Sequence, residues 1–405
     1  MTSFPELGSP SSLPWTNSTT AMRALLALAV VFVMLATTGW TAVRGHQGNS
    51  DPRAASLSAW LHDSIAGRPL PAPEAGAAVV ARFLGSLSGG QRTRLAERYP
   101  LVVGNLDGAP VELRYRANRI ALAKARSVEE RRRHAGGLTP SGRHEAGRRM
   151  HRFASLMADD RQILAFDPSG SGRVAEVFGD LDRADRVSVV VPGVDTNVLT
   201  FEKTQRAHTA PVGMARSLYA AERKAAPGTR TAVIAWADYT SPNGVGMDAA
   251  TGKLAAEGAL RLRAMVRALP GTSRASLFCH SYGSVVCGVA ARELPSRVTD
   301  VAVAGSPGMR AERVSELRTS ARIWAMRDAD DWIQDVPHLA VGGLGHGADP
   351  VSTAFGARLL SARDAKGHAG YFEPGTTSLA NFAGIGVGAV TSVICAKDDP
   401  DCSAA

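Results

Sequence analysis

From about residue 162 onward, short apolar runs alternate with segments of helical composition. Two of these runs flank a Pro-Ser-Gly turn within residues 163–180, which predicts an antiparallel hairpin. The later runs are continuously apolar, as is typical of parallel strands buried on both faces of a sheet. We predict these strands at residues 187–193, 231–238, 275–281, 298–305 and 321–328. The pattern favours a doubly wound α/β domain with a mostly parallel sheet, opened by the hairpin.

The residues before this domain differ in composition. Residues 44–78 are rich in Ala, Pro, Gly and Ser and are expected to form a linker. Helical stretches follow, and residues 127–150 contain almost no large apolar side chain, which predicts a mobile or solvent-facing insertion. The predicted parts are an N-terminal apolar segment (1–43), the linker (44–78), an Arg-rich helical region (79–160), the α/β domain (161–394) and a C-terminal tail (395–405).

The N-terminal segment contains thirteen consecutive apolar residues at positions 24–36. A run of that length suits the core of a signal peptide. Extended to Val43 it reaches about 20 residues, enough to cross a bilayer as a helix. We therefore expect an exported protein, either extracellular or anchored to the cell membrane through this segment if it is not cleaved, with the remainder outside the cytoplasm.

The charge of the chain is concentrated in one block. The 405 residues carry a formal net charge of +9 and are 45% hydrophobic, which excludes disorder throughout the chain. Residues 82–152 alone hold 16 Lys and Arg against 6 Asp and Glu. Such a block could contact nucleic acid or anionic lipid. Because no nucleic-acid motif accompanies it, we favour a solvated helical face and expect no specific nucleic-acid partner.

Four cysteines are present, none with the CxxC spacing of a zinc site, so no structural metal is expected. Cys395 and Cys402 bracket a polar stretch of the tail and can form a disulfide if the chain is exported. Cys279 and Cys287 lie in apolar surroundings and are expected to be buried free thiols.

The sequence Cys279-His280-Ser281-Tyr282-Gly283 joins a buried strand to a helix of small residues. A serine in that turn exposes its Oγ at the carboxyl edge of the sheet, above the helix N-terminus. A hydroxyl becomes nucleophilic only when a base takes its proton, and the base needs an orienting carboxylate. We predict that Ser281 is the nucleophile rather than a structural serine, and that His280 is structural.

The acid and the base are expected downstream, in that order. Three aspartates follow the strand at 321–328, and we favour Asp331 as the acid, with Asp330 as the alternative and Asp328 third. His368 stands in a Gly-flanked loop and is the expected base. Two histidines between acid and base remain alternative bases: His338 and His346.

Two backbone N–H groups are candidates for an oxyanion hole. One belongs to Tyr282, directly after the nucleophile, and the other to Val194, in the loop after the strand at 187–193. Asp195 follows that loop and is expected to cap the next helix rather than to react.

Several segments together resemble a bacterial α/β-hydrolase family catalogued as domain of unknown function 1023. They span about residues 100–390 and are PLVVGNLDGAPVELRYRANR, VVVPG, AWADYTSP, CHSYGS, SPG, DDWIQDVP, GHAGYF and SLANFAGIG. The resemblance implies an α/β-hydrolase fold with Ser281 as nucleophile, Asp331 as acid and His368 as base. It also implies that the helical region before residue 160 belongs to the same unit. Cys279 stands where the family usually has glycine.

These observations predict a serine hydrolase that cleaves an ester, esterase- or lipase-like, through an acyl-enzyme. The substrate is expected to be a small-molecule or lipid-like ester, and the reaction requires no metal or other cofactor. Two alternatives stay open. A serine peptidase or amidase would use the same triad, and a non-catalytic binding protein could keep the same fold.

Overall fold

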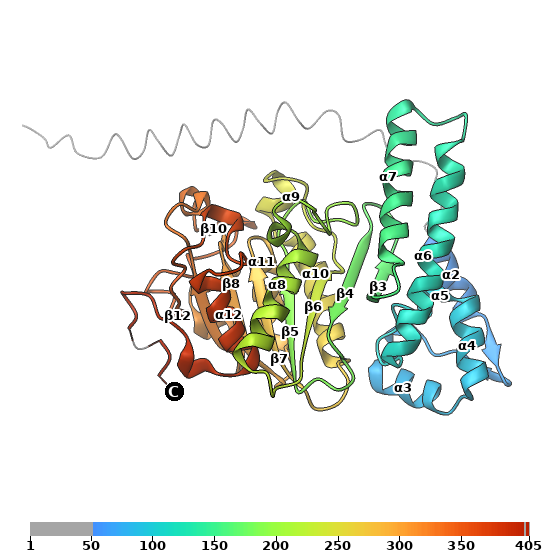
Figure 1. Ribbon diagram of the computed structural model, residues 1–405, viewed down its shortest axis with the longest axis horizontal. Coiled ribbons are helices and arrows are strands. Elements are labelled where there is room, and N and C mark those ends of the chain that lie inside the picture. The colour runs from blue at the N-terminus through green and yellow to red at the C-terminus, as the bar shows by residue number, and fades with distance from the viewer. Residues whose placement is uncertain (1–51, 401, 405) are drawn as a thin grey trace, which may run out of the picture. The chain divides into compact units, whose positions relative to one another are not determined.

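The computed structural model describes residues 52–400 and 402–404, in which eight strands form one main sheet (Figure 1). In chain order these strands are β3 (Gln162–Asp167), β4 (Arg173–Phe178), β5 (Arg186–Val191), β6 (Thr231–Ala237), β7 (Arg274–His280), β8 (Val298–Ala304), β9 (Arg322–Met326) and β12 (Arg358–Leu359). Across the sheet they follow the order β12-β9-β8-β7-β5-β6-β4-β3. The β3–β4 and β4–β6 pairs are antiparallel and the other pairs are parallel. The predicted hairpin and the five predicted strands are confirmed.

Helices cover both faces of this sheet. On one face α8 (Pro211–Ala225) packs with α12 (Thr377–Val387), and on the other α10 (Lys253–Arg267) packs with α11 (Gly283–Ala290). Alternate residues of each strand enter two separate cores. In β5, Val189 joins the core on the α10–α11 side and Val190 the core on the α8–α12 side. Because both faces are buried, the strands are apolar at successive positions, and the predicted fold class is confirmed.

A helical region precedes the sheet and has its own core. Its elements are α2 (Pro52–Leu61), β1 (Ser64–Ile65), β2 (Arg68–Pro69), η1 (Pro73–Ala75), α3 (Ala77–Gly85), α4 (Gly89–Arg98), α5 (Pro100–Val103), α6 (Val111–Arg133) and α7 (Pro140–Leu156). Trp60 and Leu70 are buried in this core. The prediction of a linker at 44–78 was therefore wrong for residues 52–78, because a few large side chains anchor a segment of otherwise small and polar composition.

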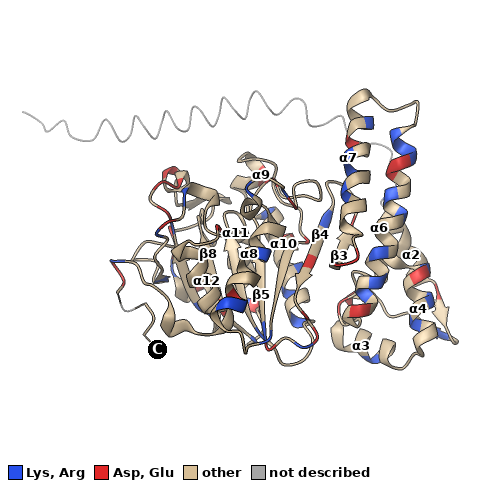
Figure 2. Ribbon diagram, viewed as in Figure 1, with Lys and Arg blue, Asp and Glu red and all other residues tan. Residues whose placement is uncertain are grey.

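Residues 127–150 are also ordered, contrary to the expected mobile insertion. They form the end of α6, a short turn and most of α7, which pack as an antiparallel pair (Figure 1). Figure 2 shows basic residues distributed along both helices. Several are paired: Arg149 donates from Nε to Glu129 at 2.9 Å, and both side chains are buried. Between α6 and α7, this buried ion pair takes the place of contacts between large apolar side chains, which are scarce in residues 127–150.

The helical region protects the open edge of the sheet. Asn105 donates to the carbonyl oxygen of Phe166 at 2.8 Å and accepts from its N–H at 3.1 Å. Asn118 donates to the carbonyl oxygen of Ile163, and Arg114 to that of Leu164. These side chains take the place of a neighbouring strand along β3, so the helical region completes the α/β domain.

Shorter elements complete the described residues. They are η2 (Ala207–Thr209), α9 (Met247–Ala250), η3 (Ala291–Glu293), η4 (Val314–Leu317), η5 (Trp332–Asp335), β10 (Ala340–Val341), β11 (Leu344–Gly345), η6 (Gly367–Ala369) and η7 (Val390–Ser392). The predicted N-terminal segment (1–43) lies outside the described residues. Within the described ranges, no helix is both long and apolar enough to cross a membrane.

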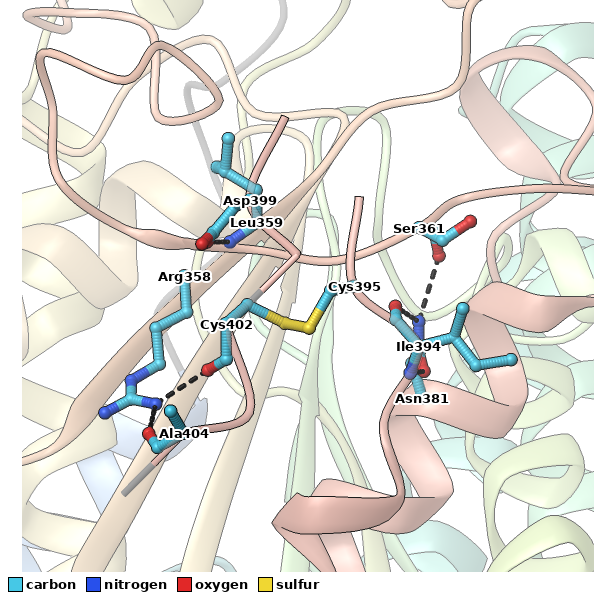
Figure 3. Close-up of a disulfide and its surroundings, with 9 residues drawn as sticks. All are labelled: Arg358, Leu359, Ser361, Asn381, Ile394, Cys395, Asp399, Cys402 and Ala404. Atoms are coloured by element: carbon cyan, nitrogen blue, oxygen red, sulfur yellow. Dashed lines mark hydrogen bonds between the residues drawn. A yellow bond between two sulfur atoms is a disulfide. The ribbon is translucent and has the colours of Figure 1, made fainter. Parts of the chain in front are cut away.

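The C-terminal tail is held against the last strand. A disulfide joins Cys395 to Cys402, as the sequence allowed (Figure 3). Arg358 donates to the carbonyl oxygen of Cys402 at 2.6 Å, and the N–H of Leu359 donates to the Asp399 carboxylate at 2.7 Å. The disulfide and these hydrogen bonds fix the tail to β12.

Candidate active site

Ser281 lies on a sharp turn between β7 and α11. Its backbone φ is 55°, in the left-handed region that residues other than glycine rarely adopt. The turn is held by the N–H of Ser281, which donates to the carbonyl oxygen of Ala304 at 3.0 Å. A Cβ at Gly283 would lie 2.2 Å from the carbonyl oxygen of Val191, so only glycine fits there. The strained turn directs the serine side chain out of the strand, as a nucleophile requires.

The cysteines on either side of this turn form a disulfide. Cys279 in β7 and Cys287 in α11 are both buried, as expected, but the prediction of free thiols was wrong. The turn reverses the chain direction and brings the two Cα atoms to 6.5 Å, within reach of a bridge. A disulfide bond therefore crosses the turn that carries Ser281. With the usual glycine at position 279, the strand and the helix would be in close contact but not bonded.

His368 in η6 contacts Ser281 directly. Its Nε2 lies 2.9 Å from the Ser281 Oγ, and its Nδ1 lies 2.8 Å from the Asp331 Oδ1. In the neutral state the serine hydroxyl donates to Nε2 and the Nδ1–H donates to the carboxylate. These side chains come from three loops at the carboxyl ends of β7 and β9 and before α12. The structure thus brings together the three residues that the sequence predicted.

Asp331 is fully buried and is the N-cap of η5. Its Oδ1 also accepts from the N–H of Ile333 at 3.0 Å, and its Oδ2 accepts from the Tyr371 hydroxyl at 2.5 Å. Burial alone would raise the pKa of Asp331, but the hydrogen bonds from His368, Tyr371 and Ile333 outweigh it and hold the pKa below the ordinary value. The carboxylate is therefore charged and fixed in orientation at neutral pH.

The alternative acid and bases lie elsewhere. Asp330 is exposed, and its N–H donates to the Asp328 carboxylate at 3.3 Å rather than its side chain contacting His368. His346 Nε2 lies 2.6 Å from the carbonyl oxygen of Ala249, and His338 lies 3.8 Å from the Asp349 carboxylate. Burial lowers the pKa of both histidines. Only His368 reaches the Ser281 hydroxyl within the described residues.

Two neighbours position the loop of His368. Asp328 accepts from the N–H of Gly367 at 2.8 Å. His280 Nε2 lies 2.5 Å from the carbonyl oxygen of His368, and its ring centroid is 4.8 Å from the His368 ring. Burial, with the nearby His368 in second place, lowers the pKa of His280 to about 3. A neutral His280 donates its Nε2–H to that carbonyl, which gives the predicted structural residue a positioning contact.

The loop after β5 lies directly over Ser281. A Cβ at Gly193 would lie 2.9 Å from the Ser281 Oγ, so the backbone there must be glycine. The N–H groups of Val194 and Tyr282 donate no hydrogen bond within residues 52–400. Asp195 was expected to cap the next helix, and this prediction was wrong. Its carboxylate accepts from the N–H of Gly244 at 2.7 Å, and no helical turn follows Asp195 before η2 at Ala207–Thr209.

Sequence reasoning missed two residues that contact the triad. Tyr371 donates to Asp331 and accepts from the N–H of Asp328 at 3.0 Å. Trp332 packs on His368 with ring centroids 4.7 Å apart. Both stand within three residues of a predicted member of the triad, so proximity in sequence was the available signal. In the described part of the chain, no group of three or more His, Cys, Asp or Glu is arranged to hold a metal ion.

One family model and several known proteins match parts of this chain. A family described as alpha/beta hydrolase matches residues 167–341, which include Ser281 and Asp331. An uncharacterized protein of Mycobacterium tuberculosis is 29% identical over 271 residues, covering 59% of this chain and 40% of that protein. Another, from Mycobacterium bovis, is 31% identical over 166 residues, covering 40% of this chain and 58% of its own length. The chain thus spans about two fifths of the length of the first relative.

Solved structures give low overall similarity. A predicted CIB-like hydrolase from Thermoplasma acidophilum has a TM-score of 0.35 at 16% identity, covering 57% of this chain and 97% of that one. A thermostable esterase has a TM-score of 0.31 at 18% identity, covering 45% and 49%. The fold assignment rests on the sheet order and the family match, which together identify an α/β-hydrolase fold.

Proposed function

We propose that the protein is a serine hydrolase that cleaves carboxylic esters through an acyl-enzyme. One observation carries the proposal: His368 lies 2.9 Å from the Ser281 hydroxyl and 2.8 Å from a buried, charged Asp331. A base within hydrogen-bond distance of a hydroxyl, itself oriented by a carboxylate, is the arrangement that makes serine nucleophilic.

In the first half of the reaction the Ser281 Oγ attacks the ester carbonyl carbon, while His368 Nε2 takes the hydroxyl proton. The resulting oxyanion accepts hydrogen bonds from the N–H groups of Tyr282 and Val194. Loss of one such donor typically costs about 3 kcal/mol of transition-state stabilisation. When the intermediate collapses, the C–O bond to the alcohol breaks and His368 returns the proton to the departing alkoxide.

In the second half a water molecule attacks the acyl carbon, and His368 takes a proton from it. The bond to Ser281 Oγ then breaks, the acid product leaves, and the serine recovers its proton from His368. In both halves Asp331 stabilises the imidazolium and keeps the Nδ1–H directed away from the reacting atoms. Every proton transfer passes through one ring nitrogen.

We also propose that the catalytic domain works outside the cytoplasm. All four cysteines are paired in two disulfides, which persist in oxidising compartments. The apolar run at residues 24–36 supplies a means of export or anchoring.

A panel of p-nitrophenyl esters of graded chain length tests the enzymatic proposal. We expect turnover by the wild type and none above background by Ser281→Ala. Ser284→Ala is the matched control, because Ser284 is a buried serine in the next helix turn and donates to the carbonyl oxygen of Cys279 rather than contacting His368. Turnover of the corresponding anilides but not of the esters would favour the amidase alternative. Equal rates for Ser281→Ala and the wild type would refute the proposal.

A further inference from the structure

Large apolar side chains are exposed mainly at one place on the described surface. Eleven such side chains are exposed in residues 52–400, and six of them lie within residues 245–247 and 332–344. Exposed apolar residues are usually scattered, so a group of this kind marks an interaction surface. We name this group the apolar rim; its members and exposed fractions are Val245 (69%), Met247 (49%), Trp332 (46%), Leu339 (48%), Val341 (69%) and Leu344 (44%).

The two segments of the rim are joined in space. Thr251 and Leu344 form an antiparallel bridge, and the short β10–β11 hairpin presents Val341 at its tip. Arg310 donates to the carbonyl oxygens of Gly343 at 3.3 Å and Gly345 at 2.7 Å. Figure 1 shows β10 and α9 at the same end of the sheet. The rim is thus a bonded frame that holds its apolar side chains in place.

This frame is attached to the residues around the nucleophile. The Tyr282 hydroxyl donates to the carbonyl oxygen of Thr251 at 2.9 Å. On the other side, the N–H of Gly244 donates to Asp195, next to the Val194 N–H. Trp332 packs against His368. The rim is therefore attached at three points to residues that adjoin Ser281 or belong to its triad, rather than lying on a remote face.

Most of the rim is uncharged. Residues 239–247 and 336–348 contain no Asp, Glu, Lys or Arg, and the exposed charged residues that border the rim include Asp248, Arg310 and Asp335, which are of both signs. A protein or nucleic-acid partner recognised by charge would meet no surface of a single sign there, whereas a lipid layer accepts protruding aliphatic tips directly. The basic residues of α6 and α7 belong to a different part of the chain (Figure 2).

We infer that the apolar rim docks the enzyme onto the surface of aggregated, uncharged lipid esters, so that a substrate molecule passes from the lipid layer to Ser281. This inference rests on the proposed ester hydrolase and adds the physical state of its substrate. Hydrolysis is therefore faster on an ester above its solubility limit than on the same ester in true solution.

The test compares wild type with Val245→Ser/Val341→Ser, and Leu260→Ser is the matched control because Leu260 is 60% exposed on α10, outside the rim. The vesicle assay uses residues 50–405, which form one compact unit and lack the apolar run at 24–36. The probes are phosphatidylcholine vesicles and tributyrin below and above its solubility limit. The double variant is expected to bind vesicles more weakly, by about tenfold for each valine, and to lose the rise in rate above the limit.

Several results would overturn the inference while leaving the proposed function intact. One is equal vesicle binding by the double variant and Leu260→Ser while both hydrolyse p-nitrophenyl acetate. Another is binding to anionic vesicles alone that salt abolishes, since that points to α6 and α7. A third is that the wild type forms a dimer, the double variant is a monomer, and the wild type does not bind vesicles. Failure of the proposed function looks different: no ester is hydrolysed, although Ser281→Ala and wild type bind vesicles equally.

Discussion

Tyr371 is predicted to stabilise the charged form of Asp331. Both side chains are fully buried, and the phenol donates to Oδ2 at 2.5 Å. Tyr371→Phe removes this donor, so the buried Oδ2 of Asp331 loses the hydrogen bond from Tyr371. A hydrogen bond to a charged group contributes about 1.5 to 3 kcal/mol to folding, so the free energy of unfolding at pH 7 falls by roughly that amount.

The loss depends on pH in a defined direction. The pKa of Asp331 in the folded protein is below the ordinary value of 3.8. Its carboxylate therefore contributes stability above pH 3.8, which is lost as the pH falls through the folded pKa. In Tyr371→Phe the pKa moves back toward the ordinary value. The difference between variant and wild type is then full at pH 7 and shrinks below about pH 3.8.

Tyr239→Phe is the matched control for this experiment. Tyr239 is equally buried, but its hydroxyl donates to the uncharged carbonyl oxygen of Pro192 at 2.6 Å. Its removal costs about 1 kcal/mol, independent of pH. Urea unfolding of both variants over a series of pH values, from pH 7 down to the lowest pH at which they stay folded, separates the two effects. If the loss for Tyr371→Phe were as independent of pH over that whole series as the loss for Tyr239→Phe, Tyr371 would not act on the Asp331 charge.

Three further predictions concern other buried groups. Replacing both cysteines of the Cys279–Cys287 disulfide by serine lowers the free energy of unfolding by about 2.5 kcal/mol and also lowers kcat, because this bond crosses the turn that carries the nucleophile. The same change at Cys395–Cys402, which closes a loop of similar length, lowers stability but leaves kcat unchanged. Equal kcat values for the two double variants would contradict this role of the Cys279–Cys287 bond. Asp331→Asn is expected to reduce kcat by about 10³- to 10⁴-fold and the exposed Asp330→Asn by less than about twofold, so the reverse ranking would reassign the acid. Burial raises the pKa of Glu222 to about 8, so wild-type stability measured by urea unfolding declines between pH 4.5 and 8, whereas Glu222→Gln loses this dependence; parallel curves would contradict it.

The fold could be predicted because its determinants are local. Continuous apolar runs such as those of β5 and β7 are expected only in strands buried on both faces, and both were located within two residues. The order of nucleophile, acid and base followed from the order that is typical of this kind of α/β fold. The alternation of Val189 and Val190 between two cores explains why no period-two pattern was visible.

The features that could not be predicted from the sequence depend on contacts between positions that are distant in the chain. Glu129 and Arg149 are residue types that usually lie on a solvated surface, so the sequence did not reveal that they are buried and paired with each other. The Cys279–Cys287 bond depends on the tightness of a turn, which composition does not reveal. No role for Tyr371 followed from the sequence, because only the fold brings its hydroxyl to Asp331.

The central claim is that His368 makes the Ser281 hydroxyl nucleophilic. Labelling with a fluorophosphonate, followed by mass spectrometry of the digested protein, tests it most directly. We predict one adduct on the wild type, located at Ser281, and labelling at least about 10³-fold slower in folded His368→Gln. A folded wild type that takes no label, or an equal labelling rate after His368→Gln, would contradict the account.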